Sequence, residues 1–117
     1  LLGALGGERF DHSYANLCVL QFLAHEGCRA VLAEKGTYIF LLREGQTEPL
    51  LHLCGATFSA FPFGCPECTV SYDGMQYPLT RKPLRSDFPL GVSNRILSDQ
   101  AAVTVHQGEM LGIVYQP

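Results

Sequence analysis

The sequence predicts a mixed fold: a strand–helix–strand α/β remnant at the start of the chain, followed by an all-β sandwich or barrel. The apolar run 1–5 ends in a glycine pair and precedes a helical stretch near 12–26, the order of an α/β unit with parallel strands. After residue 36, short β-type runs alternate with turn residues at close spacing, which is typical of sandwiches and barrels. Apolar residues make up 47% of the 117 residues, which is enough to build a core.

The α/β remnant is expected to contain two strands and one helix. The run 1–5 reads as a buried parallel strand, and because the chain opens within it on Leu1 rather than Met, we expect a fragment of a longer protein. The helix near 12–26 should end at Gly27, and 29–34 should form the second strand. Since a helix that is apolar on two sides must be covered on both, we expect missing sequence or a partner subunit over one side. Its two apolar stripes are Ala15, Cys18, Val19 and Phe22, and Leu17, Leu20 and Ala24.

The β region is expected to hold short strands separated by legible turns. Arg43–Gln46 and Gln107–Glu109 are predicted to be short hairpin links, and Tyr72–Met75 a hairpin turn built on Asp-Gly. The expected strands lie near 37–43, 48–53, 56–61, 67–72, 75–79, 92–97, 101–106 and 110–115.

Charge and composition argue against several classes of partner. The net charge is −3 and the eight Lys and Arg residues are scattered, so no basic stripe is present to bind nucleic acid. The apolar stretches stop well short of the roughly 20 residues that a membrane span needs, and no leader pattern is seen. The five cysteines are an odd number and fit reduced thiols better than a disulfide framework. We therefore expect a soluble, cytoplasmic protein without nucleic-acid or membrane partners.

The first candidate site lies where the first strand gives way to the helix. Glycines at such a junction let backbone N–H groups approach phosphate oxygens, and a helix N-terminus favours anions. Arg9 could pair with a phosphate, Asp11 could hold Mg²⁺ or a ligand hydroxyl, and His12 could donate to a nucleotide. The alternative is a tight turn in which Asp11 caps the helix and no ligand binds.

The second candidate site is the segment Gly91-Val92-Ser93-Asn94, which follows a proline-rich stretch. Ser93 and Asn94 offer donors and acceptors suited to a small polar heterocycle. Both are also ordinary turn residues, so a structural role stays open.

The third candidate is Cys65-Pro66-Glu67-Cys68, with His52 and Cys54 upstream. A C-x-x-C pair is the kind of spacing that zinc sites use, and one of the upstream residues could complete a tetrahedral set. A single pair is a weak signal, and a β-turn carrying two free thiols explains the same residues.

The order of these segments resembles that of the bacterial thiamine pyrophosphokinases across essentially the whole chain. The stretch GALGGERFDHSYANL is followed by SYDGMQYPL, GVSN and VTVHQGEMLGIV. Three family motifs carry the resemblance. The matching positions are Gly7, Arg9, Asp11, His12, Ala15 and Asn16; Gly74, Met75, Tyr77, Pro78 and Leu79, with Gln76 inserted; and Gly91 to Asn94.

The resemblance implies a homodimer that transfers pyrophosphate from ATP to thiamine, giving thiamine diphosphate and AMP, with Mg²⁺ as cofactor. Residues 1–36 would be the end of the α/β ATP-binding catalytic domain, and 37–117 the β-sandwich thiamine-binding domain. Arg9, Asp11 and His12 would lie on the ATP side, with Asp11 catalytic. Ser93 and Asn94 would help to hold thiamine at the subunit interface, where we expect Asp11 and Asn94 to meet in a pocket built by two copies of the chain.

Two departures from the family pattern matter. Glu8 stands where relatives often carry Gly or Lys, which places a carboxylate near the supposed phosphates. The Asp-rich motifs that bind Mg²⁺ in the family lie upstream of the residues present, so we expect the chain alone to be inactive. Two alternatives to an enzyme portion are a non-catalytic module that binds a small ligand or mediates dimerisation, and a structural remnant that associates through its apolar helix.

Overall fold

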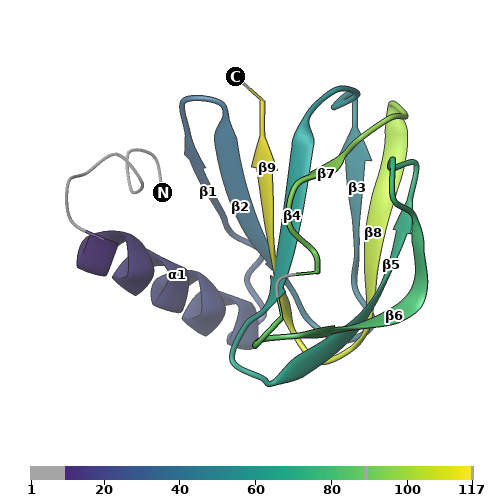
Figure 1. Ribbon diagram of the computed structural model, residues 1–117. Coiled ribbons are helices and arrows are strands. Elements are labelled where there is room, and N and C mark those ends of the chain that lie inside the picture. Colours follow the sequence, from purple (N-terminus) through teal and green to yellow (C-terminus); the bar gives the residue numbers. More distant parts are fainter. Residues whose placement is uncertain (1–9, 89, 117) are drawn as a thin grey trace.

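The computed structural model describes residues 10–88 and 90–116, and across these residues a single helix lies against a sandwich of two antiparallel sheets (Figure 1). The predicted all-β sandwich is confirmed. The elements are α1 (Phe10–His25), β1 (Val31–Glu34), β2 (Thr37–Leu42), β3 (Thr47–Leu51), β4 (Thr57–Pro62), β5 (Glu67–Asp73), β6 (Leu79–Arg85), β7 (Asn94–Arg95), β8 (Gln100–Gln107) and β9 (Met110–Tyr115).

The two sheets enclose one core. The strand order is β1-β2-β9-β4-β7 in one sheet and β3-β8-β5-β6 in the other. Along most of their length, strands β5 and β8 alternate between buried and more exposed residues, because one face of their sheet meets the core and the other faces outward. Aromatic rings fill the centre: Phe58 stacks on Phe40, and Tyr72 meets Phe58 edge to face with ring centroids 5.3 Å apart.

The turns at Arg43–Gln46 and Gln107–Glu109 exist, but the prediction that they are hairpins was wrong. The first joins β2 to β3 and the second joins β8 to β9, and in each case the two strands belong to different sheets. Strand β2 pairs with β9 instead, and β3 pairs with β8. Gly45 and Gly108 supply the left-handed φ angles of 83° and 82° that these turns use.

Helix α1 confirms the predicted helix and packs only one of its two apolar sides. Leu20 is buried with Leu32, Ile39, Leu41 and Leu111 on the outer face of the five-stranded sheet, which α1 covers in Figure 1. The other stripe faces outward, where Val19 is 43% exposed and Phe22 is 61% exposed. The expected cover over this second side stays a prediction.

Two predicted strands differ from the structure, and one lies outside it. The segment 29–34 contributes β1, but β1 pairs antiparallel with β2, because Lys35 and Gly36 form a two-residue turn with φ of 41° and 81°. The strand expected at 75–79 is replaced by β6, an edge strand that tolerates Pro83. The strand expected at 1–5 falls outside the described residues. The division at residue 36 into two domains stays a prediction, although the β1–β2 hairpin spans it.

No helix among the described residues is long and apolar enough to cross a membrane.

Candidate ligand-binding site

The segment Gly91–Asn94 is an irregular loop that ends at the first residue of β7 and is fastened to β4. Gly91 accepts a hydrogen bond from the backbone N–H of Ala60 at 2.9 Å, and a Cβ at Gly91 would lie only 2.5 Å from the Ala60 carbonyl oxygen. Ser93 has a φ of 63°, and its N–H donates to Ser59 Oγ at 2.9 Å. Such a conformation is costly for a residue with a side chain and tends to occur at functional sites.

Asn94 links two of the segments that carry the family resemblance, the one at 74–79 and the one at 91–94. Its Oδ1 accepts hydrogen bonds from the backbone N–H groups of Tyr77 at 3.0 Å and Arg95 at 2.9 Å. Its Nδ2 donates to the Tyr77 carbonyl oxygen at 2.9 Å. Asn94 is 6% exposed, so its amide is buried. Its amide therefore positions the Tyr77 backbone beside the Gly91–Asn94 loop.

A cavity of about 330 Å³ lies beside this link, which is a suitable size for a small ligand. At least part of its rim is open, since Tyr77 is 61% and Leu90 49% exposed. Its lining residues are Tyr72, Tyr77, Leu79, Leu90, Gly91, Val92 and Asn94. We call this space the Asn94 cavity. None of these side chains is charged at neutral pH, so the cavity suits an aromatic ring that carries a few polar atoms.

Tyr72 is one of the buried residues of the wall. It is 2% exposed, and burial, assisted by the neighbouring Cys68, raises the pKa of its phenol. The hydroxyl is therefore neutral at physiological pH and is able both to donate and to accept a hydrogen bond. Recognition in the Asn94 cavity would rest on ring contacts and hydrogen bonds, without an ion pair.

The residues predicted for the nucleotide side lie elsewhere on the chain. Asp11 and His12 are exposed in the first turn of α1, where the His12 N–H donates to Asp11 Oδ1 at 2.9 Å. Arg9 lies outside the described residues. The first turn of α1 lies on the β1 side of the five-stranded sheet in Figure 1, whereas β7 is its other edge strand. A meeting of Asp11 with Asn94 across a dimer stays a prediction.

The described residues do not gather a metal site. Within 10–88 and 90–116 no group of three or more His, Cys, Asp or Glu side chains is placed to hold a metal ion. The thiol of Cys54 donates to the Leu97 carbonyl and that of Cys65 to the Glu109 carbonyl, so two of the three cysteines of the zinc hypothesis have separate partners. The described His, Cys, Asp and Glu side chains therefore do not fit a magnesium or zinc site.

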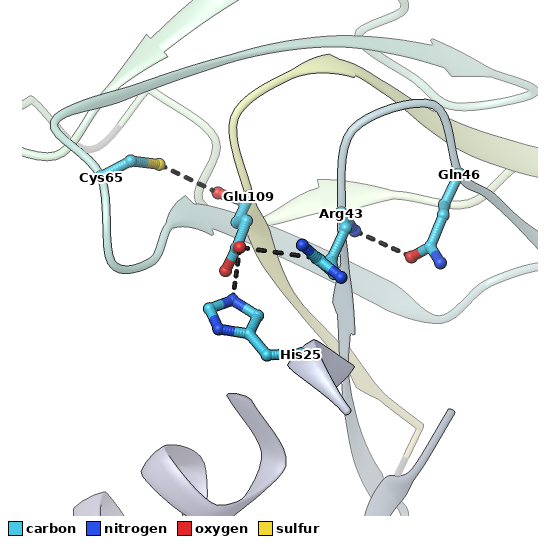
Figure 2. Close-up of polar contacts among 5 residues, drawn as sticks. All are labelled: His25, Arg43, Gln46, Cys65 and Glu109. Carbon is cyan, nitrogen blue, oxygen red and sulfur yellow. Dashed lines mark hydrogen bonds and ion pairs between the residues drawn. The ribbon is translucent and has the colours of Figure 1, made fainter. Parts of the chain in front are cut away.

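A polar cluster that the sequence did not predict ties α1 to the sandwich (Figure 2). His25 Nε2 lies 2.5 Å from Glu109 Oε1, and Arg43 Nε lies 3.7 Å from the same oxygen. The helix dipole alone is enough to explain a histidine in the last turn of a helix. Its partner is 84 positions away, so no local pattern could reveal the pair.

A second cavity of about 330 Å³ lies beneath the β1–β2 turn. Its lining includes Glu34, Lys35 and Tyr38, and it contains none of the residues predicted to bind a ligand. The Asn94 cavity is therefore the better candidate.

Comparisons with known proteins agree on one family. Residues 42–110 match the family model described as "Thiamin pyrophosphokinase, vitamin B1 binding domain". No curated protein matches the chain at a significant level.

Solved structures of the same kind share the fold. Thiamine pyrophosphokinase from Bacillus subtilis superposes with a TM-score of 0.84 at 18% identity, over 95% of this chain and 52% of that one. The enzyme from Candida albicans gives 0.81 at 17% identity, over 98% and 43%. The one from Geobacillus thermodenitrificans gives 0.81 at 19% identity, over 100% and 53%. The chain thus spans about half the length of these proteins, and at these identities the likeness establishes the fold.

Proposed function

Because the chain belongs to the thiamin pyrophosphokinase family through its vitamin B1 binding domain, we propose that it is the thiamine-binding portion of a thiamine pyrophosphokinase and that thiamine binds in the Asn94 cavity. The observation that carries the proposal is the link made by Asn94. It joins both β-domain motifs of the family resemblance at the wall of one apolar cavity.

The chemistry of the cavity suits this ligand. Thiamine carries an aminopyrimidine ring and a positively charged thiazolium ring. Aromatic faces such as those of Tyr72 and Tyr77 attract both flat rings and organic cations. Ser93 is exposed beside the cavity and has a hydroxyl to offer a ligand or a partner subunit.

The reaction that we propose for the longer protein is transfer of pyrophosphate from ATP to the thiamine hydroxyl, giving thiamine diphosphate and AMP. Arg9, Asp11 and His12 would serve the nucleotide side, with Asp11 catalytic, and a second subunit would bring that side to the thiamine. Mg²⁺ would assist the transfer through residues other than those described, since these offer no metal site. We place the protein in the cytoplasm, and we expect the 117-residue chain alone to show no turnover.

Calorimetry with thiamine tests the proposal. The wild-type chain should bind thiamine, and Tyr77→Ala should weaken binding by at least roughly tenfold, since it removes an aromatic face from the cavity rim. Tyr115→Ala is the matched control, because Tyr115 is similarly exposed at 48% but does not line the cavity. Equal affinity for both variants would show that thiamine does not bind in the Asn94 cavity. A parallel assay with ATP should give no thiamine diphosphate.

A further inference from the structure

Tyr72, a residue of the cavity wall, carries a buried oxygen atom without a hydrogen-bond partner. Among the described residues, Tyr72 Oη and Glu109 Oε2 are the buried side-chain atoms that lack a hydrogen bond. The other oxygen of Glu109 is already paired with His25. Tyr72 has no second polar atom on its side chain, and it lines the Asn94 cavity. A buried hydroxyl without a hydrogen-bond partner lowers the free energy of unfolding by about 1–3 kcal/mol. Folded proteins contain few such groups, so this one needs a reason other than stability.

The position of Tyr72 is fixed by packing and not by its hydroxyl. Its ring stands edge-on to Phe58 at 89°, and its backbone lies between Leu79 of β6 and Val103 of β8 in the sheet register. A phenylalanine would keep all of these apolar contacts. The Tyr72 hydroxyl thus makes no hydrogen bond within the described fold. Tyr72 is nevertheless one of the residues that line the Asn94 cavity.

We propose that the Tyr72 hydroxyl is the specificity-determining group of the Asn94 cavity and hydrogen-bonds to a ring nitrogen or ring amino group of a heteroaromatic ligand. This inference rests on the proposed function for naming the ligand as thiamine, whose aminopyrimidine edge carries such atoms. A hydrogen bond in these apolar surroundings is stronger than one in water. The hydroxyl is closed to solvent in the free chain, so this hydrogen bond requires the ligand to displace part of the wall.

The test compares Tyr72→Phe with the wild-type chain by calorimetry, using thiamine, 4-aminopyrimidine and toluene as probes. Removing the hydroxyl should weaken thiamine and 4-aminopyrimidine by roughly tenfold, the usual effect of one buried hydrogen bond. Toluene, which has no hydrogen-bonding edge, should bind equally well or better. Tyr38→Phe is the matched control, since Tyr38 is a partly buried tyrosine outside the cavity, and it should change none of these affinities.

Thermal unfolding of Tyr72→Phe gives an independent readout. The melting temperature should stay the same or rise, because the variant removes a polar group that the fold leaves unpaired. A fall of several degrees would mean that the hydroxyl has a structural partner, and the inference would be wrong.

The outcomes separate this inference from the proposed function. If the wild-type chain binds thiamine and Tyr72→Phe binds it equally well, the role of Tyr72 is refuted and the thiamine proposal stands. If the chain binds 4-aminopyrimidine through Tyr72 but not thiamine, the role of Tyr72 stands and the thiamine proposal fails. Binding of neither probe refutes both.

Discussion

Replacement of Asn94 should destabilise the chain more than its small size suggests. Asn94→Ala removes three hydrogen bonds, to the N–H and C=O of Tyr77 and to the N–H of Arg95. At a net value of about 1 kcal/mol each, the loss is about 3 kcal/mol, lowered to about 2 kcal/mol where water reaches the freed Tyr77 backbone. Asn94→Asp keeps the two accepted bonds but sets a carboxylate against the Tyr77 carbonyl, so it should cost about 2 kcal/mol or more.

Urea unfolding followed by circular dichroism measures these changes in the free energy of unfolding. Gln76→Ala is the control, because Gln76 is an exposed neighbour in the same turn, and its change should stay within about 0.5 kcal/mol. Both Asn94 variants should also weaken thiamine binding, since the Tyr77 backbone loses its anchor. If Asn94→Ala lowers the free energy of unfolding by less than about 0.5 kcal/mol, the reasoning is refuted, because the three hydrogen bonds would then not stabilise the fold.

Three further changes test the cavity wall, the contact of α1 with the sandwich and the buried ionisable groups. Gly91→Ala should cost about 2 kcal/mol or more in urea unfolding and abolish thiamine binding, because its Cβ would lie 2.5 Å from a backbone oxygen; unchanged stability would contradict the close approach. A double-mutant cycle of His25→Ala with Glu109→Gln should give a coupling of about 0.5–1 kcal/mol, as expected for a half-exposed pair, and zero coupling would show that the pair does not hold α1. Burial raises the pKa values of Cys68 and Tyr38 to about 12 from 9.0 and 10.0. Folding therefore favours their protonated forms. The contribution of these two groups to the free energy of unfolding should be fully present below about pH 9 and should be lost as the pH rises towards about 12. The melting temperature should fall over the same range, and it should fall less steeply with pH in Cys68→Ala.

The sequence predicted those elements whose signals are local. The strand expected at 101–106 and the helix expected at 12–26 match β8 and α1, because each prediction depends on one element and the side that it buries. The pairing of strands was less accessible. The turn at Arg43–Gln46 looks like a hairpin link, yet it crosses between sheets because β2 pairs with a strand that lies near the end of the chain. The residues of the turn therefore do not reveal which strand β2 pairs with.

In the candidate site, too, the sequence predicted residues from local motifs but not the contacts between residues that are distant in the chain. Asn94 was predicted from its motif, but its bonds to Tyr77 depend on a contact 17 positions away. Tyr72 was missed as a wall residue, although the alternation of β5 points it into the core. The unpaired state of its hydroxyl depends on the surrounding atoms, and only the folded arrangement reveals it.

A titration of the isotope-labelled chain with thiamine, followed by proton–nitrogen correlation NMR, tests the location of the ligand most directly. Binding in the Asn94 cavity predicts that the amide signals of Tyr77, Gly91 and Asn94 move with a single affinity, while those of Lys35 and Tyr38 beside the second cavity stay in place. Shifts confined to the second cavity, or no shifts at saturating thiamine, would contradict the account.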